Sequence, residues 1–405
     1  MYLLKNFSIY FGTEFINKLI PFLLLPLITT YLTPVEFGTY GIYQVFVSFL
    51  SPVISMSLQT NITRNFFKVS KEEMSRIISS LFLILTINIV IAMIIILIAS
   101  FFLEDFFNIP KRIVYILPLL IYIQTINIFN LTILRNEEKA LKYGIIQIML
   151  TLINYVTLVF MLLSLHFGWL SFVYSAVIAH FIVAVYSLLA IKKEFFIGFD
   201  FFSLKNIYAV SIPLIFHSLG GGIIAISDRL FIEKMMGLKE VGIYTIASQF
   251  GMIVMIVTNI IMTTINPWLY KKLAQDDQLV VKKMYLLMLG FTFLGLAISC
   301  ISIIVFPIII DKQYHSATNI ILALSIVYIL RGFYQIFHTV IVHEGKTKFL
   351  MYITFGGAII NIFLNYFLIP LYGLMGAISA TLTSYLFIVI FTIFFANKYS
   401  SLKWL

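Results

Sequence analysis

Five ionisable residues lie within or at the ends of long apolar segments of the sequence. Arg331 stands in 326-IVYILRGFYQIF-337, with at least ten uncharged residues on each side. Glu14 and Lys18 lie one helical turn apart in the first apolar segment, and Asp228 and Arg229 end another. A charge inside a bilayer is costly, so it usually faces a polar partner or a water-filled path. Here the basic groups can bind a phosphate-like anion, and the carboxylates can bind a proton or a cation.

The spacing of Lys18 and Arg331 predicts that they lie at one depth in the membrane. Each is eleven residues from the expected cytoplasmic end of its helix, counted from Phe7 and from Val342. At 1.5 Å per residue, both lie roughly 16 Å from that end. We therefore expect both to face one cavity. The alternative for each is a buried structural ion pair, and for Lys18 the nearest partner in sequence is Glu14.

No catalytic or metal-binding constellation accompanies these charges. The six histidines are scattered, and the single cysteine, Cys300, lies in an apolar run, so there is neither a disulfide framework nor a thiolate metal site. The triplet Gly220-Gly221-Gly222 lacks the Gly-Lys-Ser/Thr sequence of a phosphate-binding loop. We therefore expect no enzyme activity, no cofactor, no metal and no direct use of ATP.

The composition is that of a membrane protein. Of the 405 residues, 61% are hydrophobic and only 11% are charged, and the mean hydropathy is +1.04. A soluble domain has about 25% charged residues. The net charge of +10 is spread over many short loops, which argues against nucleic-acid binding. The first apolar run lacks a cleavage site, so we interpret it as an uncleaved helix.

Twelve apolar segments are long enough to cross a bilayer as helices. They lie near residues 7–31, 39–61, 77–102, 113–134, 143–165, 169–191, 206–227, 241–265, 284–310, 316–342, 349–371 and 373–396. Gly168 and Gly373 mark two tight hairpins between consecutive helices. The predicted fold is therefore an all-α integral membrane protein.

The distribution of basic residues predicts the orientation of these helices. With a cytoplasmic N-terminus, 19 of the 27 lysines and arginines fall on the cytoplasmic side and 6 on the outer side. The remaining two are Lys18 and Arg331. Short cytoplasmic loops are rich in lysine and arginine, so twelve helices with both termini in the cytoplasm fit this pattern.

Several short motifs recur in the same order at a nearly constant offset. The matches are 36-EFGTYGIY-43 with 240-EVGIYTIA-247, 137-EEKALKY-143 with 344-EGKTKFL-350, and 152-LINYV-156 with 359-IINIF-363. They divide the chain into two six-helix halves, 1–197 and 198–405. Because six is even, the halves share one orientation and are related by an axis along the membrane normal. Such repeats place the substrate path at their interface.

Three blocks resemble motifs of a known transporter family. They are 25-LPLITTYLTPVEFGTYGIYQ-44, 211-SIPLIFHSLGGGIIAISDRLFI-232 with 237-GLKEVGIYTIA-247, and 360-INIFLNYFLIPLYGLMGAISATLTSY-385. In these blocks the chain resembles the Wzx-type polysaccharide transporters, or O-antigen flippases, of the multidrug/oligosaccharidyl-lipid/polysaccharide exporter superfamily. The resemblance implies two halves around a central cavity in the cell inner membrane. It also implies export of an undecaprenyl-diphosphate-linked oligosaccharide to the outer leaflet by alternating access.

The resemblance gives the charged and polar residues provisional roles. The cavity candidates are Arg331, Lys18, Glu14, Asn361 and Asn365, with the asparagines either contacting sugar hydroxyls or bridging helices. The candidates for coupling or gating are Asp228, Arg229 and Glu14. Those for the cytoplasmic entrance are Arg64, Lys68, Lys271 and Lys272, which also act as topology determinants. The expected partners are the lipid-linked substrate, the bilayer, H⁺ or Na⁺, and other membrane proteins of polysaccharide assembly.

Two other functions remain open from the sequence. A cation-coupled multidrug exporter of the same superfamily would favour acidic cavity residues, whereas Lys18 and Arg331 are basic. A membrane-embedded glycan polymerase or ligase would be expected to have a large outer loop, but the longest expected loop has about 18 residues.

Overall fold

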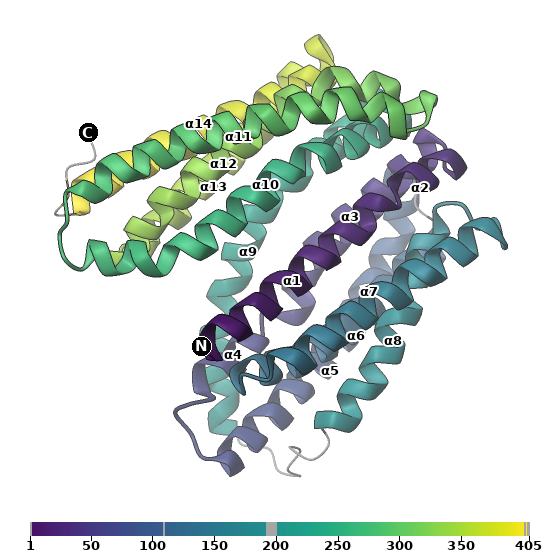
Figure 1. Ribbon diagram of the computed structural model, residues 1–405. Helices are drawn as coiled ribbons and strands as arrows, with labels where there is room; N and C mark the ends of the chain where they lie inside the picture. Colours follow the sequence, from purple (N-terminus) through teal and green to yellow (C-terminus); the bar gives the residue numbers. More distant parts are fainter. Residues whose placement is uncertain (1, 108–109, 192–200, 401, 403–405) are drawn as a thin grey trace. The chain divides into compact units, whose positions relative to one another are not determined.

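The computed structural model describes residues 2–107, 110–191, 201–400 and 402, and all regular structure in these residues is helical (Figure 1). In chain order the helices are α1 (Tyr2–Leu23), α2 (Leu25–Tyr31), α3 (Pro34–Ser55), α4 (Gln59–Asn65), α5 (Lys71–Phe107), α6 (Lys111–Asn136), α7 (Ala140–Leu163), α8 (Leu170–Ile191), α9 (Phe201–Met236), α10 (Leu238–Leu273), α11 (Leu279–Ile309), the 3₁₀ helix η2 (Lys312–Ala317), α12 (Thr318–His343), α13 (Thr347–Tyr372) and α14 (Leu374–Tyr399). Apart from the short helices α2, α4 and η2, the helices are long enough to cross a bilayer.

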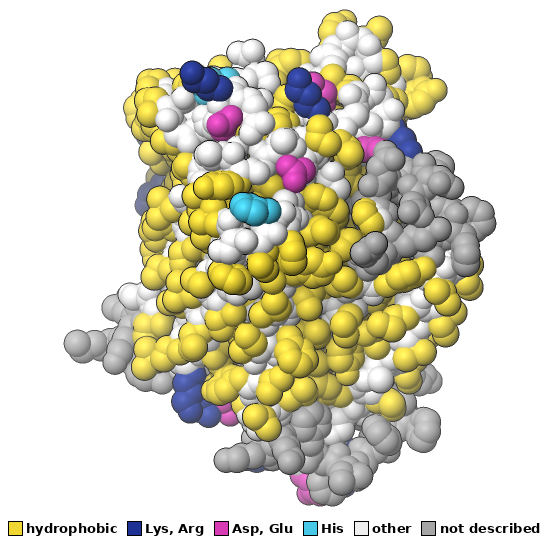
Figure 2. All heavy atoms as spheres, turned by 90° about the vertical axis from the view of Figure 1, so that its right-hand side faces the viewer, with side chains coloured by type: hydrophobic (Ala, Val, Ile, Leu, Met, Phe, Trp, Pro, Cys, Tyr) yellow, Lys and Arg dark blue, Asp and Glu magenta, His cyan; other side chains and the backbone are white. Residues whose placement is uncertain are grey.

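The predicted membrane-spanning segments correspond to these helices. Eleven stretches of the described residues are long and apolar enough to cross a membrane. The one predicted segment that is not among these eleven stretches, 206–227, lies within the 36-residue helix α9. Figure 2 shows hydrophobic side chains covering much of one face. This pattern is the one that a bilayer-spanning protein requires.

The chain folds into two compact units. Unit 1 comprises residues 1–32 and 43–219, and unit 2 comprises residues 33–42 and 220–405. Two helices contribute to both units, because α3 begins in unit 2 and α9 begins in unit 1. In unit 1, α1 packs against α7, and α6 packs against α5 and α8. In unit 2, α12 packs against α10, α11 and α14, and α13 packs against α14.

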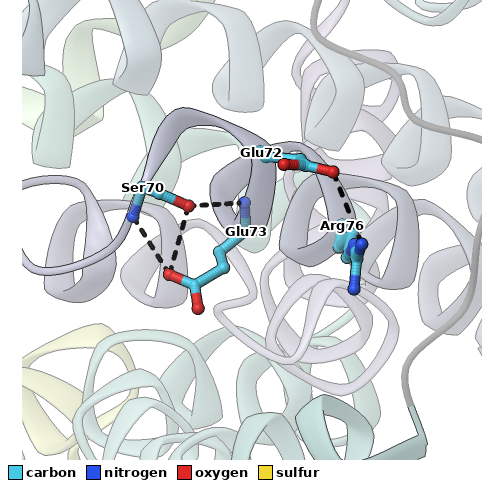
Figure 3. Close-up of polar contacts among 4 residues, drawn as sticks. All are labelled: Ser70, Glu72, Glu73 and Arg76. Atoms are coloured by element: carbon cyan, nitrogen blue, oxygen red, sulfur yellow. Dashed lines mark hydrogen bonds and ion pairs between the residues drawn. The ribbon is translucent and has the colours of Figure 1, made fainter.

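Reciprocal capping hydrogen bonds begin two of the helices. At the start of α5, the Glu73 carboxylate accepts from the Ser70 N–H at 3.0 Å, and the Ser70 hydroxyl accepts from the Glu73 N–H at 3.2 Å (Figure 3). Glu72 and Arg76 form an ion pair of 3.5 Å on the next turn. Thr33 and Glu36 make the same reciprocal pair at the start of α3. Each reciprocal pair, known as a capping box, satisfies backbone N–H donors that the first helical turn leaves free.

The second predicted helix, 39–61, is interrupted in the structure. Helix α3 ends at Ser55 and α4 begins at Gln59, with Met56 and Ser57 at φ values of 47° and 49°. Pro52 weakens the last turn of α3 because it has no N–H to donate. The Ile54 carbonyl, left free by the break, accepts from the Asn88 side chain at 3.0 Å. The average hydropathy of 39–61 did not reveal the break, although α4 itself, with the sequence QTNITRN, is polar.

The starts of α3 and α10 approach each other closely in unit 2. A methyl group added at Gly38 would lie 1.9 Å from the Leu238 carbonyl oxygen, and one added at Gly242 would lie 1.9 Å from the Pro34 carbonyl oxygen. Pro34 and Leu238 are 204 residues apart, as are Gly38 and Gly242. Each helix start therefore contacts its own repeat equivalent in a reciprocal way, as in a two-fold interface. The close approach explains why both repeats carry a glycine here.

We expect Gly38→Ala to destabilise the protein markedly. The added methyl group meets a backbone carbonyl, so the two helix starts must separate. Overpacking of this kind costs about 1–3 kcal/mol or more. Gly290→Ala in α11 is the matched control, because nothing lies within 4 Å of the added methyl group. The thermal unfolding midpoint of the purified variants in one detergent measures the effect. Equal midpoints for the two variants would contradict the close contact.

Candidate functional site

Asp228 lies at the centre of a buried polar network in unit 2. Only 3% of the residue is exposed. Its Oδ2 accepts from the Tyr244 hydroxyl at 2.6 Å and from the Thr381 hydroxyl at 2.7 Å. Its Oδ1 accepts from the side-chain amides of Asn365 at 2.8 Å and Asn361 at 3.4 Å. Helix α9 thus carries the carboxylate, and side chains of α10, α13 and α14 donate hydrogen bonds to it.

The two asparagines bridge α13 to its neighbours. The Ser227 hydroxyl donates to Asn361 Oδ1 at 2.5 Å, and Asn361 Nδ2 donates to the Thr381 hydroxyl at 3.0 Å. Asn365 Nδ2 also donates to Asn361 Oδ1 at 3.1 Å, while Asn365 Oδ1 is buried without a hydrogen-bond partner. Both asparagines are fully buried. Of the two predicted roles, bridging helices is the one this geometry displays, and contact with sugar stays a prediction.

No cation balances the Asp228 charge among the residues that the structure describes. The adjacent Arg229 forms no ion pair with it, and the Nε of Arg229 is buried without a hydrogen-bond partner. Burial of a carboxylate without a cation is costly unless hydrogen bonds compensate, and here four donors do so. The predicted segment 206–227 stops just before Asp228. The structure instead buries it inside α9, which continues to Met236.

Arg331 lies half-buried in α12 of unit 2, near several tyrosines. Its guanidinium interacts electrostatically with the hydroxyls of Tyr385, Tyr334 and Tyr328. Tyr385 and Tyr328 also interact electrostatically with Asp228. In the described part of the chain, no carboxylate lies within ion-pair distance of Arg331. The guanidinium and the buried carboxylate are therefore neighbours of the same two tyrosines.

Glu14 and Lys18 are exposed on α1 in unit 1. The ion pair that was the alternative role for Lys18 is not formed, since no oxygen of Glu14 lies within 4.0 Å of the Lys18 ammonium. Glu14 Oε1 instead accepts from the Tyr143 hydroxyl of α7 at 3.5 Å. One turn further along, Asn17 Oδ1 accepts from the Thr151 hydroxyl at 2.8 Å. The polar face of α1 is thus held against α7, and no carboxylate of the described residues lies within ion-pair distance of Lys18.

The four entrance candidates lie near helix ends, as predicted. Arg64 in the last turn of α4 and Lys68 just after it are exposed in unit 1. Lys271 and Lys272 lie in the last turn of α10 in unit 2. Lys272 pairs with Asp277 at 2.9 Å, and this hydrogen-bonded ammonium lowers the pKa of the Asp277 carboxyl.

The buried carboxylate network belongs to one repeat. With the offset of 207 residues, Asn154 in unit 1 corresponds to Asn361, and Leu158 corresponds to Asn365. Asn154 Oδ1 is buried without a hydrogen-bond partner. The two halves thus share the first asparagine but not the second, so the polar chemistry around Asp228 has no complete equivalent at these positions in unit 1.

The sequence pattern of the family described as "Polysaccharide biosynthesis protein" matches residues 3–272, well over half of the chain. The chain belongs to this family. The resemblance to polysaccharide transporters that the motifs indicated is thereby confirmed. Another protein of polysaccharide biosynthesis, the capsular polysaccharide biosynthesis protein CapF of Staphylococcus aureus, is 23% identical over 414 aligned positions. This alignment covers 98% of this chain and 99% of CapF.

Solved structures of two kinds of transporter share the fold of this family member. The lipid II flippase MurJ in an inward closed conformation superposes with a TM-score of 0.75 at 15% identity, covering 97% of this chain and 87% of MurJ. An inward-facing multidrug resistance transporter of the MATE family superposes with a TM-score of 0.74 at 14% identity, covering 92% and 93%. The predicted all-α, two-lobed membrane fold is confirmed.

Proposed function

We propose that this protein flips an undecaprenyl-diphosphate-linked oligosaccharide from the cytoplasmic to the outer leaflet. The observation that carries the proposal is Arg331, a half-buried guanidinium in a membrane-spanning helix that no carboxylate of the described residues neutralises. Such a group binds phosphate oxygens through two parallel hydrogen bonds. The family membership and the similarity to CapF support a glycan substrate. The fold shared with a lipid II flippase supports a lipid carrier.

The proposed mechanism separates the two parts of the substrate. The lipid tail stays in the bilayer while the diphosphate and sugars cross with the protein. Arg331 and Lys18 supply positive charge for the diphosphate, the arginine as a planar fork and the lysine as a point charge. With the inside negative, outward movement of an anion is favourable by about 2.3 kcal/mol per charge per 100 mV. Alternating access of the two halves completes the cycle.

Asp228 is the proposed site of ion coupling. Its carboxylate and the nearby amide and hydroxyl oxygens are the hard ligands that Na⁺-like cations prefer, and the same carboxylate can take a proton. Occupation by either ion would neutralise the negative charge in the core of unit 2. It would thereby change the hydrogen bonds that tie α9 to α10, α13 and α14. Gain or loss of one ion at Asp228 can thus alter how these four helices pack.

The remaining parts of the proposal concern the setting. The substrate is an O-antigen unit or the repeat unit of a related surface polysaccharide. The protein lies in the cell inner membrane with both termini in the cytoplasm, where it works beside other membrane proteins of polysaccharide assembly.

Deletion of the gene in its native host tests the proposal. We expect the lipid-linked glycan to accumulate on the cytoplasmic side and the surface polymer to disappear, with both effects reversed by a plasmid copy. Mass spectrometry of the accumulated lipid would identify the sugar. An unchanged surface polymer without lipid-linked glycan in the cytoplasmic leaflet would contradict the proposed function.

A multidrug exporter is the second candidate, because the MATE-family fold and a buried acid are both present. This function predicts that expression of the chain lowers the accumulation of a cationic dye in cells. Glycan flipping predicts that dye accumulation is unchanged.

A further inference from the structure

Three aromatic rings stack where α13 begins and α14 ends in unit 2. The Phe349 ring lies 4.7 Å from the Phe395 ring and 5.0 Å from the Tyr399 ring, with interplanar angles of 23° and 26°. Phe395 and Tyr399 are nearly parallel, at 5° and 6.0 Å. These contacts join the first turn of one helix to the last turns of the next, so the stack is a fixed aromatic platform.

Three lysines surround this platform. The ammonium groups of Lys346 and Lys398 lie 5.4 Å and 5.6 Å from the centre of the Tyr399 ring. That of Lys348 lies 5.3 Å from the Phe349 ring centre. Among the described residues, no carboxylate is within ion-pair distance of any of the three, although Glu344 stands in the same turn. The ammonium groups of Lys346 and Lys398 thus both lie near the Tyr399 ring, and no carboxylate of the described residues pairs with either of them.

The equivalent turn of unit 1 differs in this respect. At the offset of 207 residues, Glu137 and Lys139 correspond to Glu344 and Lys346. Lys139 pairs with Glu137 at 2.9 Å. Lys142 of unit 1 occupies the position of Phe349, so the equivalent turn of unit 1 lacks the central ring of the platform. In this turn the lysine of unit 1 is therefore paired with a carboxylate, whereas its equivalent in unit 2, Lys346, has no ion-pair partner among the described residues.

We propose that the lysine–aromatic cluster of Lys346, Lys348, Lys398 and the three stacked rings binds the head group of an anionic phospholipid. The basic-residue count assigns this end of α13 and α14 to the cytoplasmic side, where anionic lipids attract clustered lysines. Aromatic rings favour the depth of the head groups. The rings hold the ammonium groups in place, and the lipid phosphate supplies the missing negative charge.

Native mass spectrometry of the purified protein with equal amounts of phosphatidylglycerol and phosphatidylcholine tests this site. The wild-type chain is expected to retain phosphatidylglycerol preferentially. The double variant Lys346→Gln/Lys398→Gln should bind it about thirtyfold more weakly, because two lysines near an anionic surface together contribute about 2 kcal/mol. Lys346→Gln alone should give a smaller loss in the same direction.

Lys139→Gln is the matched control, since this lysine is already paired, and it should leave lipid retention unchanged. Tyr399→Phe keeps the ring and should also bind phosphatidylglycerol normally. Equal retention by the wild type and the double variant would overturn the proposal. The proposal would also be overturned if the double variant lost undecaprenyl-diphosphate binding but bound phosphatidylglycerol normally. The cluster would then serve the transported substrate. Neither result depends on whether the protein flips glycans.

Discussion

Replacing Arg331 by alanine is expected to abolish glycan export while the protein remains at its normal level in the membrane. The side chain lies among tyrosines rather than in an ion pair, so its removal leaves no buried carboxylate without a partner. The fold should therefore tolerate the change. Export should fail because the diphosphate loses its bidentate ligand. Arg331→Lys should restore export only in part, since lysine provides charge without the planar fork.

Export is measured as surface polymer in a deletion strain that carries each variant, with protein abundance followed by immunoblot. Arg76→Ala is the control, because Arg76 is an exposed arginine in a surface pair with Glu72. Full export by Arg331→Ala, or its disappearance from the membrane, would remove the binding role. Preserved export after exchanging the charges of Arg331 and Glu14 would instead indicate a structural pair.

Two substitutions at Asp228 are expected to separate folding from coupling. Asp228→Leu leaves four buried donors without an acceptor, each at a cost of about 1–3 kcal/mol, so the protein should not accumulate. Asp228→Asn keeps the size and one carbonyl oxygen but cannot titrate. It should accumulate and should lose the dependence of transport on the H⁺ or Na⁺ gradient.

Transport by the asparagine variant is compared with the wild type at several external pH values and Na⁺ concentrations. Glu72→Gln removes an exposed acid and should leave these dependences unchanged. If Asp228→Asn keeps the full wild-type dependence, the coupling ion binds elsewhere. Normal accumulation of Asp228→Leu would show that the hydrogen-bond network is not required for folding.

The arrangement of helices followed from the sequence because hydropathy, loop charge and motif order depend on short stretches of chain. The interruption at Met56 and Ser57 did not, since a turn with positive φ values leaves no mark on the average hydropathy, and Pro52 was its local signal. The burial of Asp228 did not follow from the sequence either. The predicted segment 206–227 ends just before Asp228, whereas α9 continues eight residues beyond Asp228 to Met236.

The polar site was predictable in part. The one-turn spacing of Asn361 and Asn365 indicated a shared helix face, and that face does bridge α13 to α9 and α14. The donors Tyr244 and Thr381 escaped notice because they belong to other helices, and contacts between helices leave no local spacing. Nothing in the sequence distinguishes Tyr385 among the 23 tyrosines, and only the packing of the helices shows that it lies near both Asp228 and Arg331.

The most direct test of the central claim is flipping by the purified protein in liposomes. The vesicles contain an undecaprenyl-diphosphate-linked oligosaccharide, and an impermeant glycan-cleaving enzyme is added outside. We expect the cleaved fraction to rise beyond the share already in the outer leaflet when the wild-type protein is present. Vesicles with Arg331→Ala should match protein-free vesicles. A wild-type protein that leaves the inner-leaflet glycan protected, under an imposed membrane potential and an ion gradient, would contradict the account.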